Sequence, residues 1–538
     1  MTDNKKKKFN FSLKTELDRW RFYTLIGFII IVTILGWQSD DSYHGYVMVK
    51  HLIEGNGFVY NIGERACATT SPLYTLSVAI PYFFTREMFF TSMFLDVIYS
   101  AAAYYILAYK FCRNKEQVLI SFLALVGSKS FVSYTTSGLE NSLMFLMAML
   151  FLWQYFIHDK FNRKQLFLLA LTLAGVALVR MDLTLMFIPM IVYIFIMKRD
   201  KVSFGRAVGI TFAGLAPFIL WELFSLFYYG FPFPNTAYVK IGTGISTIEY
   251  YKHGILYVMY TGLYDIVVLL VPFTYFVIAL FMKKIKYIMT AAGMALYVIY
   301  VLRIGGDFMM GRHFTVIMLV GLASFIMVQN WEKDYFDSIR KTRLVFNFIT
   351  IAAVVWSFTF GTSIGSQYLY GHKYSSFISD ERENYSNTTG FYNNLVSIVK
   401  TGKTCVQQTW NYQAPDELRS MNFSGGVLDN AAGILVYYNS DLYLNDTYCL
   451  GDPFLSKLPA IKDPNWRVGH LRRAVPEGYR ESVRNKDNEL KDPYLHEYYD
   501  KILLITRGKL FDKERIVTII NMNLGKYDYL IDKYESEQ

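Results

Sequence analysis

The feature that most constrains this chain is a succession of apolar segments separated by short polar loops. Each segment is close to the length that crosses the hydrocarbon core of a bilayer. The pattern predicts about eleven transmembrane helices, at residues 21–37, 91–110, 118–134, 140–157, 165–179, 183–197, 206–228, 264–282, 287–302, 313–329 and 344–363. The shorter apolar region 72–84 is predicted to be a re-entrant or interfacial piece.

The composition excludes several other classes of protein. Hydrophobic residues make up 53% of the chain and charged residues only 18%, against roughly 25% charge in an average soluble domain. This balance rules out a soluble multidomain enzyme and intrinsic disorder. The net charge of +10 comes from the apolar part of the chain. A nucleic-acid-binding protein would carry it on a polar domain, so we expect no nucleic-acid partner.

Basic residues occur in every second loop, which indicates how the chain is oriented. Lys and Arg accumulate on the cytoplasmic side of membrane proteins. The basic loops are 5–8, 110–115, 160–164, 198–206, 283–286 and 333–343. We therefore expect the N-terminus in the cytoplasm, and an odd number of spans then places residues 364–538 on the other side.

The predicted architecture is a polytopic α-helical membrane domain, 1–363, followed by an extracytoplasmic α/β domain, 364–538. The first outer loop covers residues 38–90. Short strands are predicted at Gly426–Leu428 and Ile434–Tyr438, and an amphipathic helix at 478–503. Cys405 and Cys449 would lie in an oxidising compartment, either bridged or as two free thiols.

Polar residues that apolar periodicity does not explain form six clusters, all on the predicted outer face. Ionisable groups at membrane depth are costly and mark functional sites, although interfacial charges and helix caps are the simpler alternative. The clusters are Asp40-Asp41, Ser137–Glu140, Arg180 with Asp182, Pro234–Lys240, Gly305–Asp307 and Gly311–His313. Together they predict one extracytoplasmic site.

A carboxylate, several cations and a membrane face suit one kind of substrate, a lipid phosphate. The carboxylate can take a proton from a hydroxyl nucleophile. Arg and Lys can hold a phosphate leaving group and neutralise its developing charge. The site therefore predicts transfer of a sugar from a polyprenyl-phosphate donor to an acceptor outside the cytoplasm, with the lipid tail between the helices.

In this order the motifs resemble the GT-C superfamily of polytopic glycosyltransferases, whose first outer loop carries an acidic pair. The resemblance is strongest to the bacterial group that includes the terminal β-(1→2)-arabinofuranosyltransferase, and more distant to protein O-mannosyltransferases. Besides the six clusters it rests on Gly55–Arg65, Thr70–Leu73, Leu450–Pro453 and Gly469–Tyr479. Ala66-Cys67-Ala68 departs from the group's pattern, so the sugar, a pentose such as arabinofuranose or a hexose, stays open.

The resemblance implies a role for each site residue. Asp40, with Asp41 as second choice, is expected to deprotonate the acceptor hydroxyl, which then attacks the anomeric carbon with inversion. The residues expected to bind donor phosphate or sugar are Lys240, Arg312, His313, Asn235, Glu140, Arg180 and Asp307. His470, Arg472 and Tyr479 are expected to bind the acceptor.

Structural alternatives stay open for most of these residues. Arg180 and Asp182 can form an ion pair, and Glu140 can cap the helix that it begins. Lys240 can be an interfacial anchor, and His313 can simply pack. The three tail residues can be ordinary surface packing.

No HExxH motif, paired CxxC, P-loop or GxGxxG occurs. We therefore expect no cofactor, although Asp40, Asp41 and Asp307 could gather a divalent ion. The expected partners are a polyprenyl-phosphate-linked sugar, an envelope glycan or glycolipid acceptor, and the lipid of a bacterial inner membrane. A lipid-linked glycan polymerase or ligase, a transporter and a non-catalytic receptor are the competing interpretations.

Overall fold

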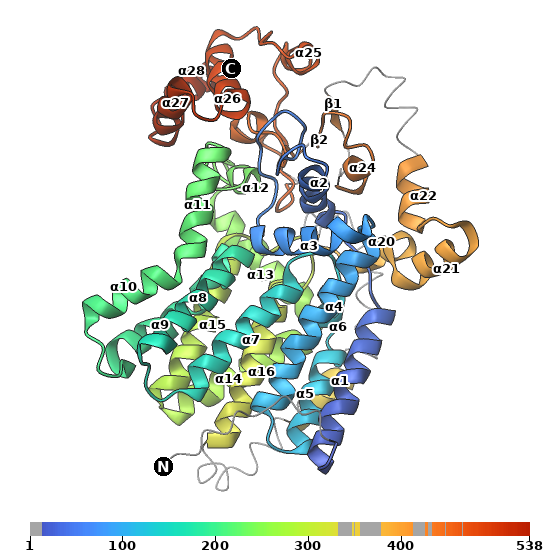
Figure 1. Ribbon diagram of the computed structural model, residues 1–538, viewed down its shortest axis with the longest axis vertical. Coiled ribbons are helices and arrows are strands. Elements are labelled where there is room, and N and C mark those ends of the chain that lie inside the picture. Colours follow the sequence, from blue (N-terminus) through green and yellow to red (C-terminus); the bar gives the residue numbers. More distant parts are fainter. Residues whose placement is uncertain are drawn as a thin grey trace.

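The computed structural model describes residues 13–331, 347–348, 350–355, 378–412, 426–428, 433–446, 448–464 and 466–537. Over these residues the chain is mostly helical, with one pair of three-residue strands. Figure 1 shows long helices side by side in a bundle, with short helices and the C-terminal part gathered beyond one end of it.

Apart from Thr247–Tyr264, which lies in a predicted loop between the spans 206–228 and 264–282, the helices of the bundle coincide with segments that the apolar pattern predicts. Its elements are α1 (Glu16–Ile34), α4 (Phe89–Ile106), η1 (Leu107–Phe111), α5 (Lys115–Gly127), α6 (Lys129–Tyr134), α7 (Asn141–Ile157), α8 (Arg163–Val179), η2 (Met181–Met186), α9 (Ile188–Tyr193), η3 (Ile194–Lys198), α10 (Phe204–Gly214), α11 (Ala216–Tyr228), α13 (Thr247–Tyr264), α14 (Val267–Met282), α15 (Ile285–Arg303) and α16 (Phe314–Trp331).

The remaining elements lie beyond the end of the bundle (Figure 1). They are α2 (Ser42–Ile53), α3 (Pro72–Thr85), α12 (Asn235–Tyr238), α20 (Glu381–Thr389), α21 (Phe391–Thr401), α22 (Cys405–Tyr412), β1 (Gly426–Leu428), α24 (Gly433–Tyr438), β2 (Leu444–Asp446), η4 (Leu455–Lys457), α25 (Tyr479–Asn485), α26 (Pro493–Arg507), α27 (Lys513–Asn523) and α28 (Asp528–Ser536).

Local sequence explains where the bundle helices begin and how closely they pack. Asn162 accepts the backbone N–H of Gln165, and the Gln165 side chain accepts that of Asn162, which is a capping box at the start of α8. Glycine permits close approach inside the bundle. A Cβ at Gly293 would lie 1.9 Å from the carbonyl oxygen of Met186, so α15 can pack on η2 only with glycine there.

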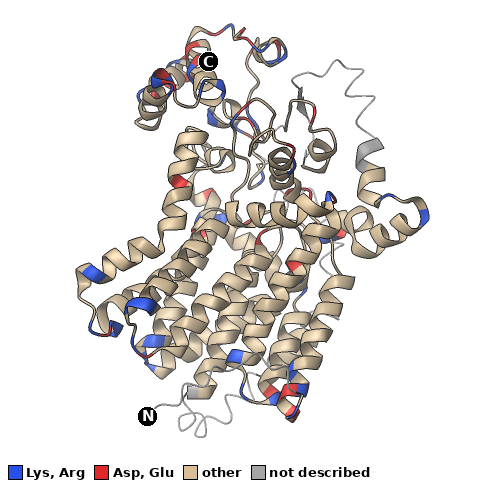
Figure 2. Cartoon of the chain, viewed as in Figure 1, with Lys and Arg blue, Asp and Glu red and all other residues tan. Residues whose placement is uncertain are grey.

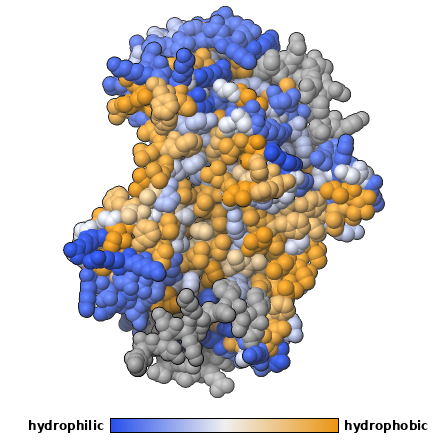
Figure 3. Space-filling model, viewed as in Figure 1, coloured by the Kyte–Doolittle hydropathy of each residue, from blue (hydrophilic) through white to orange (hydrophobic). Residues whose placement is uncertain are grey.

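Length and apolar composition identify two helices of the described chain as candidate membrane spans, Phe89–Phe111 and Ile285–Arg303. The number rises to four if each of two bent helix pairs, α10 with α11 and α13 with α14, counts as one span. Figure 3 shows an apolar band across the bundle and a hydrophilic surface over the C-terminal part. Most of the predicted span 344–363, and the boundary at 364, lie outside the described residues.

The basic loops that the structure describes, 110–115, 160–164, 198–206 and 283–286, lie at one end of the bundle (Figure 2). Lys115 pairs with Glu16 at 2.9 Å, which joins the starts of α1 and α5. The Phe161 and Arg199 backbones form a bridge between two other basic loops, and the Lys286 ammonium donates to the carbonyl of Phe156 at 3.2 Å. Figure 2 shows Lys and Arg at the lower ends of the helices accordingly. The alternation of basic and less basic loops along the sequence therefore corresponds to the two ends of one helical bundle.

The C-terminal part differs from the expected α/β domain. β1 is a strand as predicted and pairs in parallel with β2, Gly426 opposite Leu444, but the described residues around this pair are helical. The strand predicted at Ile434–Tyr438 is wrong, because these residues form α24. A short apolar run fits a strand or a buried helix equally well, and a cap from Asp40 decides for the helix.

Two smaller expectations are refined. The helix predicted over 478–503 is interrupted, and α26 restarts at Pro493 because Asp492 caps it and proline fits the first helical turn. The apolar piece 72–84 is α3, which lies across the end of the bundle (Figure 1). Cys405 and Cys449 are not joined by a disulfide.

Candidate functional site

A cavity of about 770 Å³ lies at the end of the bundle opposite to the basic loops. All six polar clusters of the sequence contribute to its wall, and so do α11 and the tail residues Leu450, Val468, Gly469 and Leu471. Of the predicted site residues, the cavity is lined by Asp41, Glu140, Arg180, Lys240, Asp307, Arg312 and His313. Clusters that are up to 270 residues apart in the chain therefore share one wall.

A chain of ion pairs organises one side of the cavity. The Glu140 carboxylate, 5% exposed, accepts from Arg180 at 2.9 Å and from Arg312 at 2.8 Å. Arg180 also donates to Asp182 at 2.8 Å, and Arg312 lies 3.6 Å from Asp307. The ion pair expected between Arg180 and Asp182 is therefore present. Because each arginine is matched by carboxylates, this chain is close to neutral.

A turn before α7 puts Glu140 in place. Gly138 has a φ of +74°, which glycine adopts without strain. Its N–H donates to the buried Asp96 carboxylate at 3.0 Å, and Ser142 donates to the same carboxylate at 2.5 Å. Glu140 stands at the N-cap position of α7, but its side chain makes no cap hydrogen bond and binds the two arginines instead.

The two adjacent aspartates have different surroundings. Asp40 is 2% exposed and does not line the cavity. Its carboxylate accepts the N–H of Gly433 at 3.1 Å and that of Ile434 at 2.8 Å, so it caps α24 of the tail. A Cβ at Gly433 would lie 2.0 Å from the Asp40 carbonyl oxygen, so this contact requires glycine. Burial raises the pKa of Asp40, although the Ile434 N–H opposes the shift.

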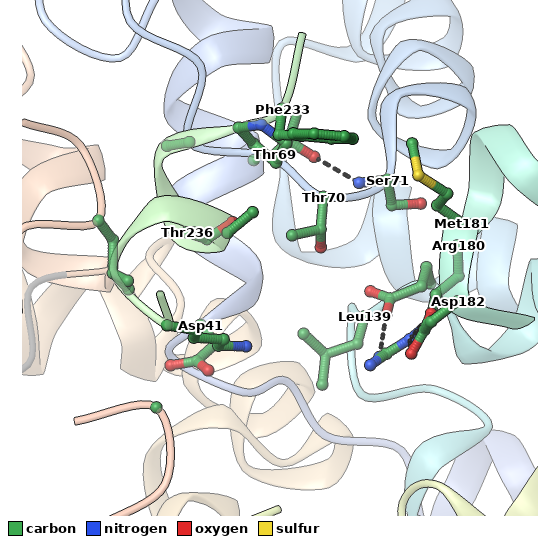
Figure 4. Close-up of a pocket in the computed structure, with 18 of the residues that line it drawn as sticks. Asp41, Thr69, Thr70, Ser71, Leu139, Arg180, Met181, Asp182, Phe233 and Thr236 are labelled. Atoms are coloured by element: carbon green, nitrogen blue, oxygen red, sulfur yellow. Dashed lines mark hydrogen bonds and ion pairs between the residues drawn. The ribbon is translucent and has the colours of Figure 1, made fainter. Parts of the chain in front are cut away.

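Asp41 lines the cavity and is only half-buried. Among the residues that the structure describes, its carboxylate has no hydrogen-bond or ion-pair partner. Figure 4 shows Asp41 on one side of the pocket and the pair Arg180–Asp182 on the other, with Leu139 between them. The tail therefore occupies the Asp40 carboxylate and leaves that of Asp41 open to the cavity.

Two cavity cations also lack an ion pair within the described chain. Lys240 follows α12, and its exposed side chain lies in the cavity. Arg303 is the last residue of α15 and lines the cavity as well. Arg303 is not among the predicted site residues, because it directly follows the predicted span 287–302. The sequence signal that could have identified it is an arginine at the end of a span, just before Gly305.

His313 and Asn235 contribute in different ways. The Nδ1 of His313 lies 3.2 Å from the Tyr297 hydroxyl, and its Nε2 lies 3.6 Å from Asp307. Asn235 is 3% exposed and does not line the cavity. Its backbone N–H donates to the Cys67 carbonyl at 2.9 Å, which fixes this loop. The adjacent residues Pro234 and Thr236 line the cavity. Asn235 is thus placed to hold the wall rather than to contact a substrate.

None of the three tail residues expected to bind the acceptor lines the cavity. His470 packs between the rings of Phe308 and Tyr448, with both centroids 4.5 Å away. Tyr479 is 2% exposed and donates to the Asp452 carboxylate inside the tail. The geometry argues against direct acceptor contacts by these side chains, because packing occupies His470 and burial removes Tyr479.

Within the described part of the chain, no group of three or more His, Cys, Asp or Glu side chains is placed to hold a metal ion. The Asp41 and Asp307 carboxylates both line the cavity, whereas Asp40 is held by α24.

Comparison with known proteins gives one relative. The chain is 27% identical over 239 residues to the terminal beta-(1->2)-arabinofuranosyltransferase of Mycobacterium tuberculosis, and the match covers 41% of this chain. The match spans only 37% of the length of that protein. No family model and no solved structure matches. The match relates the chain distantly to a glycosyltransferase.

Proposed function

We propose that this protein is a membrane glycosyltransferase. It moves a single sugar from a polyprenyl-phosphate donor to a hydroxyl of an envelope glycan or glycolipid, on the outer face of a bacterial inner membrane. The observation that carries the proposal is that one cavity contains a carboxylate, Asp41, and two cations, Lys240 and Arg303, none of which has a hydrogen-bonded or ionic side-chain partner among the residues that the structure describes. These are the groups that such a transfer needs: a base for the acceptor and countercharge for the leaving phosphate.

In the proposed reaction Asp41 takes the proton of the acceptor hydroxyl. The acceptor oxygen forms a bond to the anomeric carbon as the bond from that carbon to the phosphate oxygen breaks, so the configuration inverts. Polyprenyl phosphate leaves with the electron pair of the broken bond. Lys240 and Arg303 offset its charge, because their own charges are not already matched by carboxylates within the described chain.

The ion-pair chain has a different part in this proposal. Glu140, Asp182 and Asp307 together offset the charges of Arg180 and Arg312, so these arginines shape the wall of the cavity. A general base must lie within reach of the proton that it removes, and a rigid wall opposite Asp41 keeps the sugar at that distance. Asp307 and His313 extend the same wall.

The membrane context of the proposal is about eleven spans, with the basic loops in the cytoplasm and the tail outside. Exposed apolar side chains near the cavity offer a path for the lipid tail, since Phe233 is 41% exposed and Ile241 64%, and both line the cavity wall. The polar end of the donor can then reach Lys240 while its chain stays among lipid tails.

Substitution of the two aspartates tests the proposal. Asp41→Asn removes the base and keeps the size of the side chain, so transfer should fall about 10²- to 10⁴-fold. Asp40→Asn keeps only one carbonyl oxygen to accept from α24, so it should lower thermal stability and reduce transfer less. The measurement is release of polyprenyl phosphate from short-chain donors carrying pentoses or hexoses, in detergent, with the envelope glycan as acceptor.

The result also separates the competing functions. Full transfer activity of Asp41→Asn would exclude Asp41 as the catalytic base. Turnover only with a sugar on a pyrophosphate lipid would favour a polymerase or ligase, and no turnover with any donor would favour a carrier without catalysis.

A further inference from the structure

One face of α11 forms a wall of the cavity that no sequence motif predicts. The cavity-lining residues of this helix are spaced at intervals of three, one and three, which places them on a single helical face. They are Phe218, Trp221, Glu222 and Ser225. Leu220 and Leu223 point away from the cavity and are 64% and 57% exposed. The helix thus separates an apolar outer surface from the interior of the cavity.

Glu222 is the one charged residue of α11. Its half-buried carboxylate has no hydrogen bond or ion pair with any residue that the structure describes. An ionisable side chain in an apolar helix is costly unless it has a binding partner. Because Glu222 faces the cavity, that partner is a group in the cavity.

Its neighbours indicate the chemistry of the partner. Trp221 and Phe218 place aromatic rings in the wall beside the carboxylate. An aromatic face packs against the C–H groups of a sugar ring, and a carboxylate accepts hydrogen bonds from two hydroxyls at once. A phosphate would be repelled by Glu222, so the lipid phosphate does not fit at this wall.

We propose that Glu222 and Trp221 form a subsite for a neutral sugar ring, Glu222 accepting from two neighbouring ring hydroxyls and Trp221 stacking on the ring. The inference rests on the proposed glycosyl transfer and specifies where it binds sugar. The ring belongs either to the donor or to the end of the acceptor glycan, and both present the same chemistry.

A binding measurement tests the subsite without any turnover. Purified protein is titrated with neutral methyl pentosides and hexosides and followed by saturation-transfer NMR. Glu222→Gln should weaken binding about 10- to 100-fold, as expected for hydrogen bonds to a charged group. The control is Glu249→Gln, an exposed pair with Lys252 on α13, which should bind as the wild type does. Unchanged binding by Glu222→Gln overturns the inference.

Kinetics then identify the source of the ring. If Glu222→Gln raises the KM for acceptor and leaves donor hydrolysis by water unchanged, the subsite holds the acceptor. If it raises the KM for donor in that hydrolysis, the subsite holds the donor sugar. Unchanged values for both overturn the inference.

Two further results keep the inference separate from the proposed function. Loss of glycoside binding by Glu222→Gln in a protein that transfers no sugar would support the subsite and reject the transferase. If Glu222→Gln does not fold, Trp221→Leu replaces it and should weaken binding about 10-fold. Wild-type binding by a folded Trp221→Leu would equally overturn the subsite.

Discussion

Single charged residues of the cavity differ in whether they have a partner within the described chain. Glu140 has two arginine partners and is nearly inaccessible, so its role is to hold the wall together. Asp41 has no partner among the described residues, so it is available for a substrate. Removing one member of a buried ion pair leaves the other charge unmatched, which costs far more than loss of an exposed pair.

This difference predicts the effect of two glutamine substitutions. Glu140→Gln weakens one charged hydrogen bond of each arginine and leaves Arg180 with Asp182 and Arg312 with Asp307, so it should destabilise the protein by about 2 kcal/mol or more. Glu16→Gln removes the exposed pair with Lys115 and should cost less than about 1 kcal/mol. The measurement is the unfolding of both variants in detergent. Equal losses of stability would contradict a structural role for Glu140.

At the scale of elements, η4 of the tail fixes the loop that carries Lys240. The Lys457 ammonium lies 3.7 Å from the ring centre of Phe231 and 3.6 Å from that of Tyr238. The Arg473 guanidinium donates to the Val239 carbonyl at 2.7 Å. Burial lowers the pKa of Lys457 to about 7, although Asp452 opposes the shift. The tail therefore positions the loop of Lys240, and the contact made by Lys457 depends on whether its side chain is protonated.

The lowered pKa predicts how stability changes with pH. An unfolded lysine stays protonated up to about pH 10.4, whereas folded Lys457 loses its proton near pH 7. Between these values the unfolded chain holds one more proton, so this residue makes stability rise with pH by about 1.4 kcal/mol per unit. Denaturant unfolding of wild type and Lys457→Met from pH 6 to 10 measures it. Identical slopes for the two proteins would refute the shift.

At the scale of the whole molecule, the bundle has a basic end and a cavity end. Contacts such as Lys115 with Glu16 join the basic loops, and the tail covers the cavity end through Asp40 and α24. A transferase acting outside the cytoplasm needs the cavity end to face outward, as the distribution of Lys and Arg predicts.

Labelling of introduced cysteines tests this orientation. Exposed Lys115 begins α5 at the basic end of the bundle, and exposed Lys526 follows α27, which lies beyond the other end (Figure 1). Cys405, the one native thiol that is not buried, is first replaced by serine. An impermeant maleimide should label Lys526→Cys in intact spheroplasts, and should label Lys115→Cys only after permeabilisation. The reverse pattern would place the cavity in the cytoplasm.

The helical bundle, its two ends and the gathering of polar clusters at one end follow from the amino-acid sequence alone. They depend on local properties: apolar segments of helical length, caps such as Asn162, and basic residues in every second loop. Seven of the predicted site residues line the cavity for the same reason, because each lies in or beside a loop at the same end of the bundle.

Which of these residues can contact a substrate depends on the folded structure. Asp40 and Asp41 are equivalent in the sequence, but Asp40 caps α24, nearly 400 residues further on, and Asp41 stays open to the cavity. In the sequence, Arg303 and Glu222 cannot be distinguished from other residues of an apolar span or its end. In the folded structure both line the cavity. The ion pairing and burial of a side chain depend on contacts between segments that are far apart in the chain. Local sequence patterns do not predict those contacts.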